Sequence, residues 1–271
     1  MVLWQKHAAA EWLAAHEFSL QEIAGREMAI ISRPGQKRSL VQVLCRRRGL
    51  AERLVRNFGG AARPLPRDLA QSQKAHPPIR VGRRLQVVSE PVPELAKKTQ
   101  LVIPAAGAFG TGEHATTAMS LRLLEESTRP LPRGWRLLDA GTGTGILALA
   151  ARSLGADEVV GLDNDPRAIV HARENARLNH VARARFLAAD VLVWKPADRY
   201  EIITANLFSE LLIAALPRFR RALRAKGRLI ISGILRGQSA AVERALLRHR
   251  FALEKKRRRG KWIALSASQK T

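Results

Sequence analysis

The sequence predicts an α/β protein built on a doubly wound parallel sheet, with a small α/β unit in front of it. Three observations carry this prediction. From residue 101 onward, short apolar strands alternate strictly with longer helical segments. A glycine-rich turn, DAGTGTGIL at 139–147, follows the first strong strand of that series. After the last helix, FALEKKRRRGKWIALSA at 251–267 is typical of a closing hairpin.

The residues before 101 form two further segments. Residues 1–62 are expected to be a small basic α/β domain, and residues 63–100 a linker followed by a hairpin at 79–90. Within the small domain the expected elements, in order, are a helix at 4–16, strands at 28–33 and 39–45, and a helix at 49–58. Trp4, Trp12 and Leu13 are its expected core residues.

The third segment, residues 101–271, is the expected sheet domain. Its hydrophobic periodicity changes repeatedly between that of a buried strand and that of an amphipathic helix. The expected strands lie at 136–141, 158–163, 184–190, 200–207 and 227–233, and the expected helices at 145–155, 166–179, 209–223 and 237–250. A further helix is expected to begin at Thr116 and Thr117.

Composition narrows the functional classes. The 271 residues include 47 Lys and Arg against 23 Asp and Glu, a formal charge of +24. This charge suits RNA or RNA-associated partners, although a solvated basic surface explains it equally well. Cys45 is the single cysteine, so an internal disulfide and a cysteine metal site are excluded. We expect no metal and, since no apolar run approaches about 20 residues, no membrane span and a cytoplasmic location.

The glycine turn indicates the ligand class. Gly141, Gly143 and Gly145 follow a G-x-G-x-G spacing, whereas a dinucleotide site needs a small residue at the position of Ile146. Asp163 ends the next strand, where a carboxylate can accept hydrogen bonds from ribose hydroxyls. The combination favours a nucleoside without a pyrophosphate, namely S-adenosylmethionine. The alternative is a tight turn with Asp163 capping the helix that follows.

Asn206 ends the strand at 200–207 and is the candidate catalytic residue. Its side-chain carbonyl can accept a hydrogen bond from an amine and direct the nitrogen lone pair toward a methyl donor. Leu207 and Phe208 stand where the common base-methylating variant has two prolines, which counts against base methylation of that kind. The alternative is that Asn206 is a turn residue at a strand end.

A second glycine loop, AFGTGEHATT at 108–117, precedes the turn. FGTGEHATT, DAGTGTGILALAA, GLDNDPRAIVHARENARLN, TANL and SGIL occur in the order and spacing of the ribosomal protein L11 methyltransferase (PrmA) family, which this chain resembles over about residues 76–265. The resemblance implies a Rossmann-like class I methyltransferase in which both loops close on one S-adenosylmethionine. It implies cofactor contacts from Thr117, Gly141, Asp163 and Asn206, with Gly143 beside them.

The resemblance also implies a substrate and a docking domain. The expected reaction is N-methylation of lysine or N-terminal amines of a ribosomal protein, docked by a ferredoxin-like N-terminal domain. The first strand of that domain is expected to be missing or very short here. The stretch 28–51 is basic and free of acids, which suits an RNA-bound substrate or a different one. The alternatives are an RNA methyltransferase and a non-catalytic protein that binds RNA or ribosomes.

Two further side chains are candidates for roles at this site. His114 could act as a general base for an amine that must lose a proton, or it could brace its own glycine loop. The second interpretation is favoured. Asp190, at the end of the third strand, could reach the adenine amine.

Overall fold

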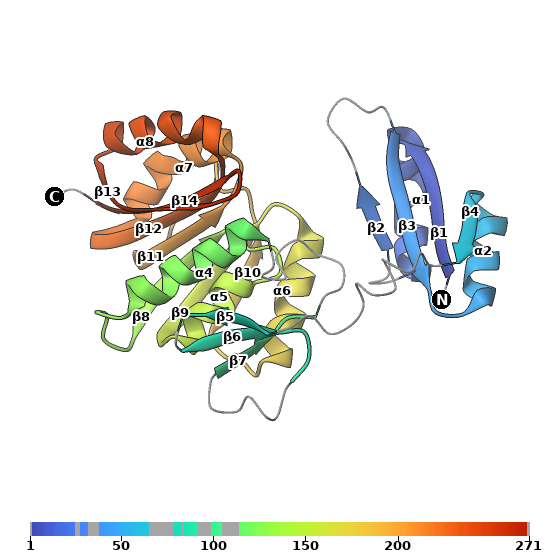
Figure 1. Cartoon of the computed structure of the whole chain (residues 1–271), viewed down its shortest axis with the longest axis horizontal. Helices are drawn as coiled ribbons and strands as arrows, with labels where there is room; N and C mark the ends of the chain where they lie inside the picture. The colour runs from blue at the N-terminus through green and yellow to red at the C-terminus, as the bar shows by residue number, and fades with distance from the viewer. Residues whose placement is uncertain are drawn as a thin grey trace. The chain divides into compact units, whose positions relative to one another are not determined.

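The computed structural model describes residues 2–24, 28–31, 38–64, 78–82, 84–91, 99–104 and 114–269. The chain divides into two compact units. Among the described residues, unit 1 holds 2–64 and unit 2 holds those from 78 onward (Figure 1). The strands at 79–102 therefore belong to the same unit as the large sheet. No helix in the described part of the chain combines the length and the hydropathy that a membrane crossing needs.

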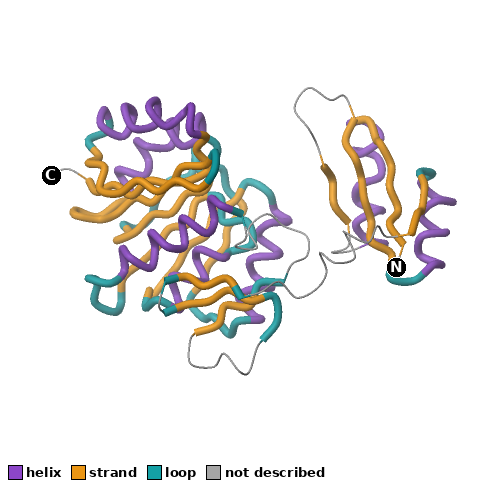
Figure 2. The backbone as a smooth tube through the Cα atoms, in the orientation of Figure 1, coloured by secondary structure: helices purple, strands orange, loops and turns teal. Residues whose placement is uncertain are grey.

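Unit 1 is a four-stranded antiparallel sheet in the order β2-β3-β1-β4, with two helices (Figures 1 and 2). Both helices contribute to a single core with the sheet, which means that they cover the same face. This arrangement is the ferredoxin-like one that the resemblance implied. Its elements are β1 (Val2–Ala9), α1 (Ala10–Ala24), β2 (Met28–Ile31), β3 (Arg38–Cys45), α2 (Arg48–Phe58) and β4 (Ala61–Pro64).

Expectations for both ends of unit 1 were wrong. The chain does not begin with a helix at 4–16, and the first strand is neither missing nor short: β1 pairs with β3 over all eight of its residues and with β4 on its other side. Trp4 is fully buried in β1 and donates its indole N–H to the carbonyl of Gly59 at 2.8 Å. The alanines after Trp4 favour a helix locally, but pairing on both sides outweighs that preference. β4 comprises residues 61–64, of which the last two were expected to belong to the linker.

Unit 2 is built on a seven-stranded sheet in the order β10-β9-β8-β11-β12-β14-β13. All neighbouring strands are parallel except at β14, which runs antiparallel to both β12 and β13. The doubly wound sheet and its closing hairpin are thereby confirmed. The strands are β8 (Trp135–Ala140), β9 (Ala156–Asp163), β10 (Ala184–Ala188), β11 (Tyr200–Asn206), β12 (Leu223–Leu235), β13 (Phe251–Arg259) and β14 (Trp262–Gln269).

Helices cover both faces of this sheet (Figure 1). One apolar core joins the sheet to the first three helices and to a small three-stranded sheet, and a second core joins the opposite face to the last two helices. The first group comprises α4 (Ala115–Thr128), α5 (Ile146–Ser153), α6 (Pro166–Leu178), β5 (Ile79–Val81), β6 (Leu85–Val88) and β7 (Thr99–Val102). The second group comprises α7 (Ser209–Ala222) and α8 (Ser239–Arg248), with the short helix η3 (Arg236–Gln238) before α8.

The parallel register brings the carboxyl ends of the central strands to one edge. Ala140 of β8 lies opposite Leu162 of β9 and Ala205 of β11, and Asn206 lies opposite Ser232 of β12. Ligands of open parallel sheets bind at this edge, where the strand order reverses. We call it the carboxyl edge.

Candidate active site

The glycine turn joins β8 to α5 at the carboxyl edge. Gly141, Gly143 and Gly145 all have positive φ, of 72°, 53° and 80°, which side chains with a Cβ adopt only at a cost. A Cβ on Gly141 would lie 2.4 Å from Cδ2 of Leu207, so a residue other than glycine would collide there. The amide of Gly141 donates to the carbonyl of Leu162 at 2.8 Å, which ties the turn to β9.

Asp163 ends β9 and holds the middle of this turn. Its Oδ2 accepts the amide of Gly143 at 2.9 Å and its Oδ1 accepts the amide of Asp165 at 3.0 Å. The helix cap at α6 is made instead by Asp165, whose Oδ1 accepts the amide of Arg167 at 2.9 Å. Each Asp163 oxygen therefore has acceptor capacity left for a hydroxyl. The geometry supports the ribose-binding interpretation of Asp163 over the capping one.

Asn206 lies at the end of β11 and reaches the start of α4. Its Nδ2 donates to Oγ1 of Thr116 at 3.2 Å and to Oγ1 of Thr117 at 3.5 Å. The structure thus brings Asn206 and Thr117 together although 89 positions separate them. Within the described residues Oδ1 of Asn206 has no hydrogen-bond donor, which leaves it available to an acceptor amine.

His114 occupies the N-cap position of α4. Its Nδ1 lies 2.7 Å from Oγ1 of Thr116 and accepts the amide of the same residue at 3.4 Å. Burial, followed by the positive charge of Lys261, lowers the pKa of His114. A neutral ring engaged with Thr116 fits the bracing role. The preceding residues 108–113, with the glycines of the second loop, lie outside the described residues.

Asp139 is a buried carboxylate that the sequence interpretation missed. It is fully buried in β8, and it accepts hydroxyl hydrogen bonds from Thr142 at 2.8 Å and Thr204 at 2.7 Å. Burial raises the pKa of Asp139 to about 6, although the two hydrogen bonds from threonine act to lower it. Asp139 therefore ties the glycine turn to β11. The sequence did contain a signal for Asp139, namely an acidic residue inside the apolar run RLLDAG.

Asp190 follows β10 at the same edge and is exposed. Its Oδ1 accepts the amide of Leu192 at 2.8 Å, which orders the turn. The neighbouring Ala189 donates its amide to the carbonyl of Asp163 at 2.8 Å. Asp190 is therefore one residue away from a direct backbone contact with Asp163, the candidate ribose-binding residue. A contact with adenine stays a prediction.

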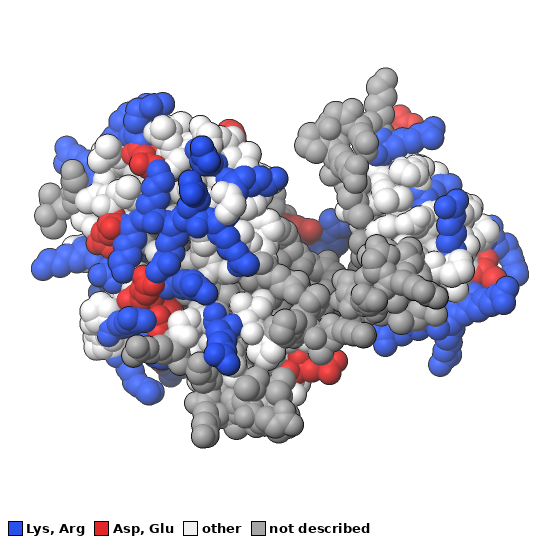
Figure 3. All heavy atoms as spheres, in the orientation of Figure 1, with Lys and Arg blue, Asp and Glu red and all other residues white. Residues whose placement is uncertain are grey.

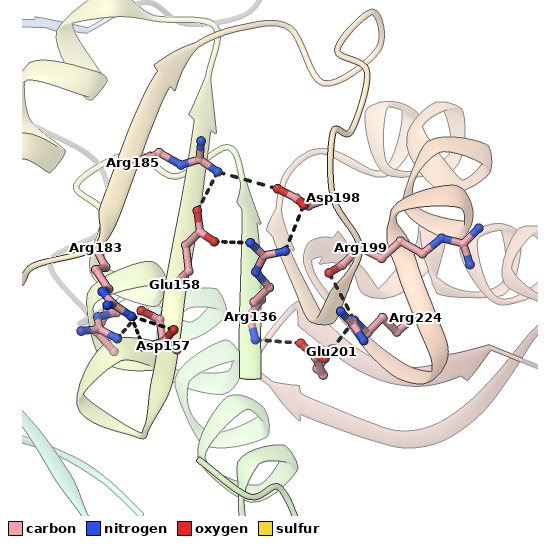
Figure 4. Close-up of polar contacts among 10 residues, drawn as sticks. Arg136, Asp157, Glu158, Arg183, Arg185, Asp198, Arg199, Glu201 and Arg224 are labelled. Carbon is pink, nitrogen blue, oxygen red and sulfur yellow. Dashed lines mark hydrogen bonds and ion pairs between the residues drawn. The ribbon is translucent and has the colours of Figure 1, made fainter. Parts of the chain in front are cut away.

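The opposite, amino edge of the sheet holds a network of ion pairs (Figure 4). Arg136 pairs with Glu158 at 2.6 Å and Asp198 at 3.0 Å, and Arg224 pairs with Glu201 at 3.0 Å. Arg136, Asp198 and Arg224 border a hollow of about 960 Å³ at the starts of β8, β11 and β12, away from the glycine turn. Arg136 and Arg224 are thus neutralised by neighbouring acids.

The residues at the carboxyl edge fit S-adenosylmethionine. The turn is too crowded at Gly141 for a larger residue, the cap of α5 is Gly145 with Ile146 next to it, and Asp163 offers free acceptor capacity. Such an edge accepts a nucleoside and lacks the spacing that a pyrophosphate needs. The fold and this edge define an S-adenosylmethionine-dependent methyltransferase of the Rossmann-like class.

The family model described as "Ribosomal protein L11 methyltransferase (PrmA)" matches residues 68–270. The chain belongs to this family, as the two glycine loops led us to expect. It is 35% identical over 239 residues to the ribosomal protein L11 methyltransferase of Lacticaseibacillus paracasei, covering 83% of this chain and 72% of the relative. It is 38% identical over 200 residues to that of Pelotomaculum thermopropionicum, covering 73% and 64% respectively.

A solved structure agrees with this assignment. The ribosomal protein L11 methylase of Lactobacillus delbrueckii subsp. bulgaricus superposes with a TM-score of 0.65 at 31% identity, covering 72% of this chain and all of that one. Several relatives are matched over less than two thirds of their own length, down to 52% for the one from Desulforapulum autotrophicum. The cofactor contacts of Thr117, Gly141, Gly143, Asp163 and Asn206 remain predictions.

Proposed function

We propose that this protein transfers methyl groups from S-adenosylmethionine to lysine or N-terminal amines of ribosomal protein L11. The relatives' names support this substrate. The observation that carries the proposal is the position of Asn206, held by Thr116 and Thr117 at the edge that also bears the glycine turn. A ribosomal substrate implies that the reaction takes place in the cytoplasm.

Some of the candidate residues would hold the cofactor, and Asn206 would orient the amine that is methylated. When bound, S-adenosylmethionine supplies an electrophilic methyl group on sulfonium sulfur. Gly141 and Gly143 of the glycine turn would line one wall of the cofactor site, Asp163 would accept the ribose hydroxyls, and Thr117 would form the other wall. Asn206 accepts an N–H of the amine through Oδ1 and aims the lone pair in line with the methyl group. Positioning of this kind supplies several kcal/mol of a methyl-transfer barrier.

The amine must be neutral before it attacks, because a protonated amine has no lone pair. A lysine amine has a pKa of about 10.4, and the proton leaves to solvent. His114 is not needed as the base, since its Nδ1 is engaged by Thr116 and its ring braces α4. The attacking nitrogen gains the methyl carbon as the bond from carbon to sulfur breaks.

Unit 1 is the proposed docking domain. It has the ferredoxin-like topology, and the stretch from 28 to 51 holds no acid, although Arg48 at the start of α2 pairs with Glu52 just after it. Ribosomal proteins lie on RNA, so a basic docking unit suits a substrate that is presented with RNA. The net charge of +24 keeps methylation of RNA itself as the second candidate.

The test uses tritiated S-adenosylmethionine with large ribosomal subunits from cells that lack this protein, and with isolated L11. Protein and RNA are separated after the reaction and counted. The informative variant is Asp163→Ala, and its matched control is Asp165→Ala, which removes a neighbouring acid whose side chain caps α6 and pairs with Arg167. Label in L11 with wild type and the control, but not with Asp163→Ala, is the expected result.

Label in RNA would overturn the proposal in favour of the second candidate. Absence of label in both fractions, with cofactor binding intact by equilibrium dialysis, would mean that the enzyme has another substrate. Absence of cofactor binding in the wild type would support a non-catalytic binding protein.

A further inference from the structure

Four cations cluster where the β13–β14 hairpin meets the end of β12. We call Arg236, Arg258, Arg259 and Lys261 the cationic tip. Arg259 pairs with Trp262 across the hairpin, and the amide of Arg236 donates to the carbonyl of Lys261 at 2.9 Å. All four residues are exposed.

The cationic tip lies beside the candidate active site. The ring of Trp262 meets the ring of His114 edge-on, with centroids 5.1 Å apart. His114 binds Thr116, and Thr116 accepts from Asn206 at 3.2 Å. A continuous line of contacts therefore runs from the hairpin turn to Asn206, at the carboxyl edge.

Charge neutralisation differs along the hairpin. In its stem, Lys255 pairs with Glu126 at 2.9 Å, Arg257 pairs with the same carboxylate, and Lys256 pairs with Glu243 at 2.6 Å. Within the described residues, none of the four side chains of the cationic tip forms an ion pair.

The sequence explains this excess of positive charge. It has no Asp or Glu from 255 to 271, nor from 211 to 242, so both strands that meet at the tip lack acids there. Figure 3 shows the same imbalance, with Lys and Arg crowded over the hairpin and few acids among them.

We propose that the cationic tip binds the phosphate backbone of RNA next to the methyl-transfer site. Three of its four cations are arginines, whose guanidinium groups match phosphate oxygens with two parallel hydrogen bonds. Phe208 adds an exposed aromatic ring at the same edge: it is 76% exposed, and the next residue, Ser209, donates its hydroxyl to Gln238 of η3 at 2.8 Å. Cations beside an exposed aromatic ring are typical of surfaces for single-stranded nucleic acid, since a base can stack on the ring.

This inference rests on the proposed function in one respect, because an RNA-bound ribosomal protein would bring both its amine and its RNA to this edge. An acidic protein segment is the competing occupant. It would match the charge, but it would make no use of an exposed aromatic ring beside the arginines.

The test measures RNA binding without cofactor or protein substrate. A fluorescein-labelled single-stranded RNA of about 20 nucleotides is titrated with the full chain at several salt concentrations, and anisotropy gives the affinity. The tip variant is Arg236→Gln, Arg258→Gln and Arg259→Gln together. The matched control is Arg221→Gln, Arg248→Gln and Arg250→Gln, which removes the same charge from exposed positions at the amino edge.

We expect the tip variant to lower the slope of log affinity against log salt by about 2 and to bind about 100-fold more weakly at 0.1 M salt. The control variant should lose much less of its affinity for RNA. Equal losses in both variants would overturn the inference, since binding would then follow net charge alone. The inference would also be overturned if the tip variant lost binding to labelled poly-glutamate and kept its binding to RNA, since the tip would then bind an acidic protein segment.

Methylation of isolated L11 separates the two proposals. The tip variant should methylate L11 in the absence of RNA at the wild-type rate, because it keeps the candidate site residues. Failure of the wild type to methylate L11 would count against the proposed function and would leave the RNA measurement standing.

Discussion

Asp139→Asn tests how the buried carboxylate beneath the glycine turn affects stability. The substitution keeps the shape of the side chain and removes its charge. One of the two threonine hydroxyls that now donate to Asp139 can turn to another acceptor, because Thr204 also lies 3.4 Å from the carbonyl of Leu138. We therefore expect a folded variant whose stability responds differently to pH.

The magnitude follows from the raised pKa. Burial moves the pKa of Asp139 from 3.8 to about 6. A carboxyl group whose pKa is raised by folding adds stability below the unfolded value, and this stability is lost as the pH rises through the folded value. The full change corresponds to about 3 kcal/mol, of which roughly two thirds falls between about pH 4.5 and 7.5.

The assay is urea unfolding of wild type and Asp139→Asn at matched pH values across that window. The wild type should lose about 2 kcal/mol relative to the variant as the pH rises, because all other titrating groups are shared. The transition of unit 1 serves as the internal reference where two transitions are resolved. A difference that stays constant across the window within about 0.5 kcal/mol would refute the argument that burial raises this pKa.

Three further outcomes are expected. Gly141→Ala should destabilise unit 2 by about 1–3 kcal/mol in urea unfolding, and adding Leu207→Ala should recover only the part due to the collision, because the positive φ remains; full recovery would mean that backbone strain contributes nothing. Asn206→Ala should slow single-turnover methyl transfer by about a hundredfold at saturating cofactor, where a loss of cofactor affinity does not limit the rate, and an unchanged rate would exclude its role in aiming the amine. Trp4→Phe should lower the stability of unit 1 by about 1 kcal/mol, since the buried ring is kept and its hydrogen bond is lost; circular dichroism on thermal unfolding reports it, and an unshifted transition would contradict it.

The sheet of unit 2 was predictable because its signals are local. Each strand is a short apolar run, and each helix has its own periodicity and termini, such as Pro166 at the first position of α6. The glycine turn and Asp163 could be found for the same reason, since the spacing of a strand, a turn and a helix is written in consecutive residues. Asn206 was found as the last residue of a strand.

The start of the chain was mispredicted because its structure depends on distant partners. Residues 2–9 contain alanines that favour a helix, yet they form the strand that lies between β3 and β4. Pairing with residues 38–45 and 61–64 makes residues 2–9 a strand, and this pairing cannot be read from the local sequence.

The sequence by itself determined the fold class, the glycine turn, the acidic residue after the second strand and the family. Only the tertiary structure decided that Asn206 reaches Thr116 and Thr117, that Asp139 ties the glycine turn to Thr204 of β11, and that the cationic tip lies beside His114. The physical reason is that covalent spacing dictates turns and periodicity, whereas contacts between residues 65 or more positions apart depend on strand order and register. Those contacts exist only once the whole sheet has formed.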